Sequence, residues 1–202
     1  MNRKRVQRLW REEGLRVPPY APKRRRIGNS TVPAKRLRAM RMNQVWALDF
    51  LFDSTSDGRP IKALAMCDEF SRESIGRHLG RSITADDVVK GLDRAMGERG
   101  APEFVRFDNG PEFIAAAIRD WCRFSGAGAV YIEPGSPWQN PFVESFIGKA
   151  RDELFAREIF HSVFEARVLY SDWCDIYNRR RPHSSIGYLP PAAFAAMFTT
   201  VR

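Results

Sequence analysis

The order of hydrophobic and polar positions predicts that the folded part of this chain begins with three antiparallel strands. The stretch Gln44–Phe52 reads QVWALDFLF, which is apolar on both faces and typical of a strand inside a covered sheet. Ser56–Arg59 has the composition of a tight turn, and a second apolar run, Ile61–Cys67, follows it. The two runs are therefore expected to form a hairpin. A third strand is expected at about Ser74–Leu79.

Strands and helices alternate in the rest of the chain. The helical spacing of Val88, Leu92 and Met96 predicts a helix over 86–96, with Thr84 as its N-cap. This order of elements describes a mixed α/β sheet covered on both faces, and it leaves the order of the strands open. The further elements are expected as a strand at Phe104–Phe107, a helix at Phe113–Phe124, a strand at Gly128–Ile132, a helix from Asn140 to about Phe155 and a helix at about Ser162–Tyr177.

The composition limits the class of protein. The chain has 202 residues, of which 44% are hydrophobic and 28% are charged, as in a globular domain with an appendage. Its apolar runs are far shorter than the ~20 residues that span a bilayer, and no export signal opens the chain. We therefore expect a cytoplasmic protein that has no membrane contact. The cysteines lack zinc-ligand spacing and are expected to be reduced core residues; they are Cys67, Cys122 and Cys174.

The positive charge is concentrated at the start of the chain. Residues 1–42 hold 14 Lys and Arg against two acidic residues, a formal charge of +12, whereas residues 43–202 hold 19 against 22, a charge of −3. Such dense like charge favours an arm that binds a polyanion, and nucleic acid is preferred because the arm has few large apolar residues for a membrane. A solvated basic tail is the alternative. We expect a DNA-binding arm over 1–42 and a folded core over 43–202.

Three acidic residues stand where a simple fold would not need them. Asp49 interrupts an apolar strand, and a buried carboxylate without partners is costly. Each acid also has a plain structural explanation: backbone partners for Asp49, turn formation for Asp108 in Asp-Asn-Gly, and the helix dipole for Glu144. The first two are expected on strands of one sheet and the third on a helix, so the three can converge. Arg151 follows Glu144 by seven residues and is expected on the same helix face.

Carboxylates that converge repel one another and raise each other's proton affinity. A hard divalent cation that prefers oxygen ligands relieves this repulsion, and magnesium has these properties. Two such ions about 3.5–4 Å apart can activate an attacking oxygen and stabilise a leaving oxygen at a phosphodiester. A basic arm that holds DNA would serve the same chemistry, so the charge pattern and the acidic residues predict one task.

Seven short motifs resemble, in order, the integrase core of the insertion-sequence-three transposases, sometimes called OrfB and related to retroviral integrases. The resemblance runs from about Asn2 to Met197. It includes 35 residues between Asp108 and Glu144, as the family pattern requires. The motifs lie at Trp46–Phe50, Asp57–Arg59, Phe70–Glu73, Phe107–Phe113, Pro134–Asn140, Val143–Phe146 and Tyr177–Ser185.

The resemblance implies an RNase H-like fold, a mixed five-stranded sheet flanked by helices, with the basic N-terminal arm in addition. It implies that Asp49, Asp108 and Glu144 are the catalytic triad and hold two magnesium or manganese ions. Arg151 matches the basic residue that the family places seven positions after the glutamate, and it would hold the DNA of the element ends. The neighbouring residues expected to contact DNA are Lys149, Gln139 and Asn140.

The resemblance also implies a reaction and partners. Water would cleave DNA at the element ends, and the freed 3′-hydroxyl would attack another phosphodiester, without a covalent protein–DNA intermediate. Such enzymes act as multimers on paired ends, often with an upstream helix-turn-helix protein. We therefore expect a homo-oligomer on element-end and target DNA, associated with the bacterial nucleoid. Family members usually carry residues before Arg3–Leu15, so this chain is expected to be short at its N-terminus.

Two other functions stay open at this stage. A shortened, non-catalytic transposase would bind DNA and regulate transposition, and it would show no metal-dependent strand transfer. A stand-alone nuclease of the RNase H type would hydrolyse RNA–DNA hybrids and join nothing. His183 is expected to pack the tail against the core, with a phosphate contact as the alternative. Three tryptophans are expected in the core rather than as stacking platforms for bases: Trp46, Trp121 and Trp173.

Overall fold

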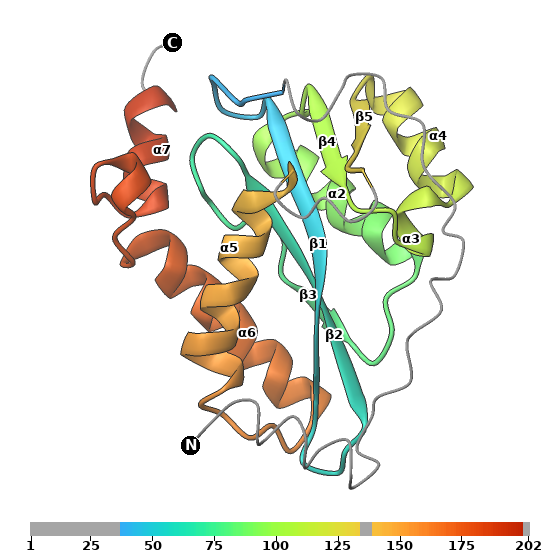
Figure 1. The fold of residues 1–202 in the computed structure, drawn as a ribbon, viewed down its shortest axis with the longest axis vertical. Helices are drawn as coiled ribbons and strands as arrows, with labels where there is room; N and C mark the ends of the chain where they lie inside the picture. Colours follow the sequence, from blue (N-terminus) through green and yellow to red (C-terminus); the bar gives the residue numbers. More distant parts are fainter. Residues whose placement is uncertain (1–36, 134–138, 200–202) are drawn as a thin grey trace, which may run out of the picture.

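A computed structural model describes residues 37–133 and 139–199 of the chain, which form one mixed sheet with helices on both faces (Figure 1). The strand order is β3-β2-β1-β4-β5. The first three strands are antiparallel, and β4 and β5 continue the sheet in parallel with β1. The strands are β1 (Val45–Ser54), β2 (Pro60–Asp68), β3 (His78–Gly80), β4 (Phe104–Phe107) and β5 (Gly128–Tyr131).

Two groups of helices cover the sheet. The helices α5 and α6 lie on one face, and α2, α3 and α4 lie on the other (Figure 1). None of the helices described is long and apolar enough to cross a membrane. The helices are α2 (Ala85–Arg99), α3 (Pro111–Ile114), α4 (Ala116–Ser125), α5 (Pro141–Ala150), the π-helix η3 (Arg151–Phe155), α6 (Val163–Arg179), the 3-10 helix η4 (Ser184–Ile186) and α7 (Pro191–Thr199).

The alternation of side chains along β1 divides the core into two clusters. Ala47 and Leu51 belong to the cluster under α5 and α6, whereas Trp46, Leu48 and Phe50 belong to the cluster under α2 and α4. Successive residues of a strand point to opposite faces. The residue between Leu48 and Phe50 in the sequence therefore faces α5, and this residue is an aspartate.

Most of the predicted elements are confirmed. The hairpin of β1 and β2 and the strands β4 and β5 lie where the pattern placed them. Thr84 caps α2 through a reciprocal capping box with Asp87, and Ser162 caps α6. The three tryptophans are buried at no more than 7% exposure, as predicted, and the three cysteines are buried and unpaired.

Three predicted details were wrong, and one helix was not predicted. The third strand is only His78–Gly80, because the chain before it pairs with β2 only through a single bridge between Ser74 and Cys67. The helix expected at Phe113–Phe124 is two helices, since Ala115 has an extended ψ of 152°. The helix expected to continue to Phe155 changes to a π-helix after Ala150. The C-terminal tail contains an additional helix, α7, which Pro191 opens.

The predicted arm lies mostly outside the described residues, which begin at Leu37. The last residues of the arm contact the core. The backbone oxygen of Leu37 accepts a hydrogen bond of 2.7 Å from Arg106, and Arg41 forms an ion pair of 2.7 Å with Glu103. The boundary between arm and core at residue 42 therefore stays a prediction, although contacts to the core begin before it.

Candidate active site

Asp49 lies in the middle of the sheet, on the face that α5 covers. It pairs with Ala65 of β2, and its Oδ1 accepts a hydrogen bond of 2.7 Å from the backbone of Phe50. Burial, together with the charges of Asp108 and Glu144, raises the pKa of Asp49 from 3.8 to about 6, although the hydrogen bond from Phe50 opposes the shift. The three predicted acids are therefore close enough to act on one another electrostatically.

Asp108 follows β4, the parallel neighbour of β1. The register pairs Ala47 with Arg106, and its extension by two residues brings Asp108 beside Asp49. The Oδ1 of Asp108 accepts a hydrogen bond of 2.8 Å from the backbone of Gly110. A side chain at Gly110 would begin 2.9 Å from that oxygen, so glycine fits this close approach. Asp108 therefore forms the turn, as its structural explanation predicts, and also lies beside Asp49; the two roles are compatible.

Glu144 is an exposed residue in the first turn of α5. The buried face of this helix packs against β1 and β2. Glu144 lies outside that face, near the surface of the sheet. Partial desolvation raises the pKa of Glu144. The start of the helix is tied to β1 by Asn140, whose Nδ2 donates to the oxygen of Leu48 at 3.3 Å. The buried face consists of Val143, Phe146, Ile147 and Ala150.

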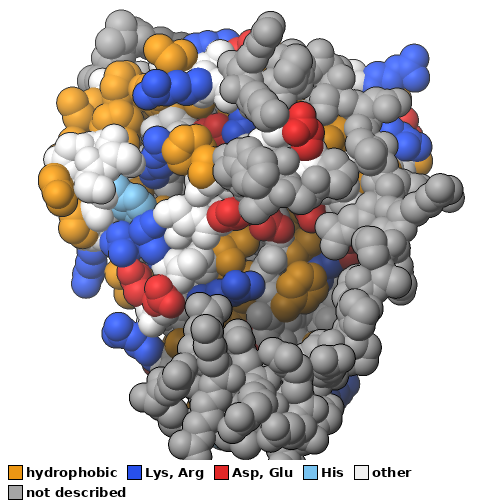
Figure 2. All heavy atoms as spheres, in the orientation of Figure 1, with side chains coloured by type: hydrophobic (Ala, Val, Ile, Leu, Met, Phe, Trp, Pro, Cys, Tyr) orange, Lys and Arg blue, Asp and Glu red, His pale blue; other side chains and the backbone are white. Residues whose placement is uncertain are grey.

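The two basic residues predicted near Glu144 lie at different places on the helix. Arg151 is exposed at the start of the π-helix, and its charge lowers the pKa of Asp49, opposing the effect of burial. The guanidinium of Arg151 is therefore close enough to Asp49 to act on it electrostatically. The Nζ of Lys149 donates to the oxygen and the hydroxyl of Ser145 at 3.2 and 2.5 Å. Acidic and basic side chains lie side by side on the face that carries α5 (Figure 2).

Gln139 and Asn140 are buried at 4% and 1% exposure, although both were predicted to contact DNA. The Oε1 of Gln139 accepts a hydrogen bond of 2.9 Å from the backbone of Glu133, and Asn140 holds β1. In this conformation the two amides position the start of α5 rather than face solvent. Their contact with DNA stays a prediction that needs a rearrangement of this segment.

The donor set of the three acids fits a hard divalent cation. Carboxylate oxygens are the ligands that magnesium prefers, and a cation would offset both the burial of Asp49 and the repulsion by Asp108 and Glu144, which together raise its pKa. Within 37–133 and 139–199, no group of three or more His, Cys, Asp or Glu side chains is arranged closely enough to hold a metal ion. The structure thus brings the acids into electrostatic range of one another without forming a complete metal cage.

Sequence reasoning missed a buried ion pair beside the site. Arg106 and Glu69 are 3% and 0% exposed at their side chains, and 2.8 Å separates Nη1 from Oε1. Arg106 interrupts the apolar strand β4 two residues before Asp108, which is the same kind of signal that singled out Asp49.

The predicted packing role of His183 is confirmed. It is 7% exposed, its ring meets Tyr177 edge-on, and burial with the charge of Lys149 lowers its pKa to about 4.

Comparison with known families agrees with this geometry. Two models described as integrase core domain match residues 39–137 and 125–191. The chain is 41% identical to an uncharacterized 39.2 kDa protein of insertion element IS476 from Xanthomonas euvesicatoria, over 99% of this chain and 57% of that protein. It is 39% identical to an uncharacterized 31.7 kDa protein of insertion element IS407 from Burkholderia multivorans, over 96% of this chain and 69% of that protein.

Solved structures share the fold at low sequence identity. An intasome of simian T-cell lymphotropic virus, in complex with a PP2A regulatory subunit, matches with a TM-score of 0.65 at 15% identity, over 86% of this chain and 60% of that chain. The HTLV-2 integrase catalytic core domain in complex with magnesium matches with a TM-score of 0.55 at 13% identity, over 78% and 99%. The fold is therefore the RNase H-like fold of retroviral integrase catalytic cores, as predicted.

The sheet, the acids on its surface and the family models together define a protein of the integrase-core class. The chain belongs to the insertion-sequence transposases of the integrase superfamily. It spans 57% and 69% of the length of the two relatives described above.

Asp49→Asn is expected to raise the free energy of unfolding when divalent cations are absent. The folded pKa of about 6 exceeds the ordinary value of 3.8, so the ionised carboxylate opposes folding above about pH 6 and costs nothing below about pH 4. The gain should be on the order of 1–2 kcal/mol at pH 7, after allowance for partial exposure, and should vanish as the pH falls to 4. Chemical denaturation in EDTA at pH 4, 5.5 and 7 measures this gain. The exposed Asp120 provides the control variant, Asp120→Asn, and an equal gain at all three pH values would contradict the prediction.

Proposed function

We propose that this chain is a DNA transposase that cleaves the ends of its element and transfers the freed 3′-hydroxyl to target DNA. The observation that carries the proposal is the partly buried carboxylate of Asp49 in the middle of the sheet, whose pKa is raised to about 6 by burial and by two further acids. A buried charge of this kind costs stability unless it serves a purpose. Membership of the insertion-sequence transposases supplies the substrate class, which is DNA.

The proposed cofactor is magnesium or manganese, with two ions held by Asp49, Asp108 and Glu144. A divalent cation supplies positive charge that activates an attacking oxygen and stabilises a leaving oxygen. Asp49 lies on β1, Asp108 directly follows the adjacent strand β4, and Glu144 lies on α5. The magnesium named for the HTLV-2 integrase core supports the choice of metal.

The proposed reaction has two steps that balance without a protein–DNA bond. In the first, water adds to a phosphodiester at the element end, and the broken bond leaves a free 3′-hydroxyl. In the second, this 3′-oxygen attacks a target phosphodiester, and the target's own 3′-oxygen leaves with a proton from solvent. Both steps exchange one P–O bond for another, so a single acidic site serves both.

The proposed partners are two classes of DNA and other copies of the chain. Element-end DNA would contact the basic arm, Arg151 and Lys149, and target DNA would enter the same acidic site. The intasome named for the simian virus relative supports action as a homo-oligomer on paired ends. We also propose an upstream helix-turn-helix partner that recognises the terminal repeats, and association with the bacterial nucleoid.

A strand-transfer assay tests the proposed function. Purified chain is incubated with labelled linear DNA that carries the element ends from the flanking genome, in magnesium or manganese, with an EDTA control. Nicked ends and joined products that require the metal are expected. DNA binding without any joining would instead favour the non-catalytic regulatory product. Hydrolysis of an RNA–DNA hybrid without joining would favour an RNase H-type nuclease.

Arg151→Gln is expected to weaken binding of element-end DNA by about tenfold and to reduce the salt slope of binding by about one. Arg151 is exposed, and its charge acts on Asp49, so DNA that reaches the acidic site would pass close to it. Arg157→Gln is the matched control, because Arg157 is an exposed arginine beyond the π-helix whose Nε donates to the backbone of Asp152 at 3.1 Å. Fluorescence anisotropy over a salt series measures both effects. Equal losses of DNA affinity in the two variants would contradict a specific role of Arg151 in binding the element ends.

A further inference from the structure

Beneath the start of α5 lies a group of charged side chains, two buried and one partly buried, that the proposed chemistry does not use. We call Glu69, Arg72 and Arg106 the Glu69 clamp. Glu69 follows β2, Arg72 lies in the turn that comes next, and Arg106 lies on β4. None of the three is an acid of the proposed triad. The clamp nevertheless contacts the segments that carry two of those acids.

Arg106 connects three separate segments through one guanidinium. Its Nη1 lies 2.8 Å from Glu69 Oε1 and donates to the backbone oxygen of Gln139 at 3.0 Å. Its Nη2 donates to the backbone oxygen of Leu37 at 2.7 Å. Arg106 thus ties the strand that leads to Asp108 to the entry of α5 and to the end of the basic arm.

Arg72 connects the same turn to α5 from another direction. Its guanidinium lies over the ring of Phe142, with 3.7 Å from Cζ to the ring centroid, and Phe142 comes two residues before Glu144. Its Nη1 donates to the backbone oxygen of Glu69, and its Nε donates to the hydroxyl of Ser185 at 3.3 Å. Two sequence motifs that the proposed catalysis leaves unexplained, around Phe70–Glu73 and around His183, therefore meet at the helix of Glu144.

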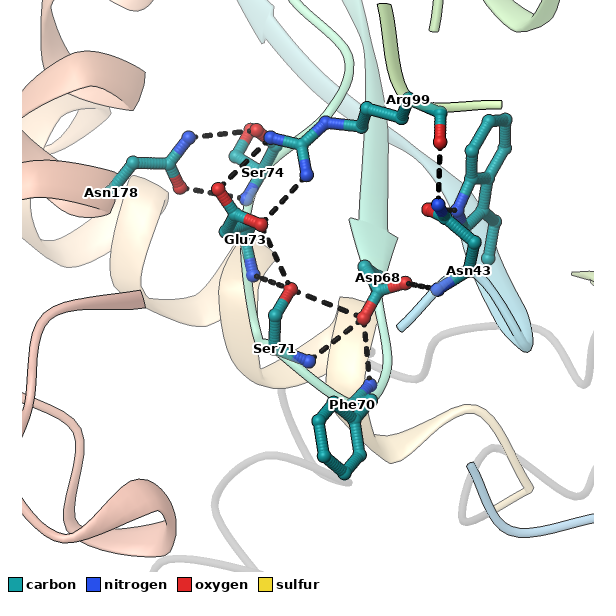
Figure 3. Close-up of polar contacts among 9 residues, drawn as sticks. Asn43, Asp68, Phe70, Ser71, Glu73, Ser74, Arg99 and Asn178 are labelled. Atoms are coloured by element: carbon teal, nitrogen blue, oxygen red, sulfur yellow. Dashed lines mark hydrogen bonds and ion pairs between the residues drawn. The ribbon is translucent and has the colours of Figure 1, made fainter. Parts of the chain in front are cut away.

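The turn that carries the clamp is itself held firmly (Figure 3). Asp68 accepts hydrogen bonds from the backbones of Phe70, Ser71 and Asn43 at 3.0, 2.8 and 2.7 Å. Glu73 binds both terminal nitrogens of Arg99 at 2.7 and 2.9 Å. These bonds hold the turn at residues 68–73 to Asn43 and to α2. Because the turn is fixed in this way, a shift of the clamp arginines would move α5 rather than the turn.

The clamp is costly if stability is its only purpose. Burial raises the pKa of Glu69 to about 7 in spite of the nearby arginines. Four buried polar atoms in or next to the clamp make no hydrogen bond within residues 37–133 and 139–199: Glu69 Oε2, Arg106 Nε, Gln139 Nε2 and Asn140 Oδ1. Apolar residues of similar volume often stabilise a core at least as well as a buried ion pair, whereas a buried pair can specify one arrangement. A positioning role explains why charge is buried here.

We infer that the Glu69 clamp positions α5, and with it Glu144, against the strands of Asp49 and Asp108, and that Arg106 links this position to the end of the basic arm. The inference rests on the proposed function for the meaning of the three acids. The residues of the Glu69 clamp are positioning residues, because they contact the backbone of Gln139 and the ring of Phe142 at the start of α5 rather than the reacting groups. Loss of the clamp should loosen the acidic site without unfolding the sheet.

The test replaces the ion pair as a unit, since removal of one partner would leave a buried charge that itself destabilises the fold. In Glu69→Met/Arg106→Met, we expect a folded protein with DNA affinity within about twofold of wild type. At saturating DNA, kcat should fall at least tenfold with little change in KM. The manganese concentration that half-saturates the thermal shift of the DNA-free protein should rise about tenfold. The matched control is Arg77→Met/Asp175→Met, which removes an ion pair of 2.7 Å between the β3 segment and α6 and should leave manganese binding unchanged.

Arg72 provides a second variant in case the double variant does not fold. Arg72→Gln removes the cation over Phe142 and is expected to give the same split between kcat and KM at a smaller size, about three- to tenfold. Wild-type kcat and wild-type manganese binding in both folded variants would overturn the inference. If wild type joins no DNA but the clamp variants still weaken manganese binding, the proposed function fails while the clamp stands.

Discussion

Asp49→Asn, Asp108→Asn and Glu144→Gln are each expected to lower end cleavage and strand transfer by at least ~10³-fold, equivalent to roughly 4 kcal/mol of transition-state stabilisation. Each change keeps the shape of the side chain and removes its negative charge. In the structure, Asp49 responds electrostatically to the other two acids, so the three are expected to act as one unit and their losses should not add. DNA affinity should change by less than about twofold, because the net positive charge lies in residues 1–42, which carry +12 against −3 for residues 43–202.

The measurement for the triad is a single-turnover strand-transfer assay with saturating enzyme, accompanied by anisotropy for DNA binding. Asp152→Asn is the matched control, since Asp152 is an exposed acid in the π-helix directly after Arg151. It should retain activity within a few-fold of wild type. A triple variant that still joins ends would show that these acids do not carry the chemistry.

The elements that local chemistry determines were predicted well. The hairpin of β1 and β2 follows from two apolar runs and a tight turn, and α2 follows from an apolar stripe behind a Thr84 cap. In each case the information lies within a few residues of the element. The mixed sheet also followed from the order of elements, although the order of its strands stayed open until the structure showed it.

The details that depend on distant contacts were not predicted. The sequence has no proline or glycine at Ala115 or at the change to the π-helix after Ala150, so no such local signal marks either position. The close approach of Gly76 to the Met66 side chain, before the short β3, joins two separate segments of the sequence. The helix α7 had a local signal, a proline followed by an alanine-rich run, that was left unused.

The site shows the same division between residue type and direction. A charge inside an apolar strand drew attention to Asp49, whose role as a site residue stays a prediction, and the same signal at Arg106 was not recognised. The sequence names Gln139 and Asn140 as polar residues at the entry of a helix, but only the structure shows that both amides point into the protein. Residue type predicts which chemistry is available, whereas the direction of a side chain depends on how the whole chain packs.

Deletion of residues 1–36 is expected to remove most of the affinity for DNA while leaving the acidic site folded. These residues hold 12 Lys and Arg against two acids, and each phosphate that a protein neutralises contributes about 0.9 to the slope of log K against log salt. If half of the 12 cations contact phosphates, the slope should flatten by roughly 5 and affinity at low salt should fall at least ~100-fold. The deletion keeps Leu37 and Arg41, so the contacts of the described segment with Arg106 and Glu103 are retained.

A graded variant separates charge from length in this arm. Replacement of Lys23, Arg24, Arg25 and Arg26 by Gln removes four of the 12 cations at unchanged length, and the slope should fall by up to about 3.6. Anisotropy titrations across a salt series give both slopes, and thermal unfolding verifies that the core is intact. An unchanged slope after the deletion would place the DNA surface on residues 37–202, whose formal charge is close to neutral. In that case Arg151, Lys149 and the arginines at 179–181 would have to supply the phosphate contacts, because a nearly neutral core binds DNA only where its positive charges are gathered on one face.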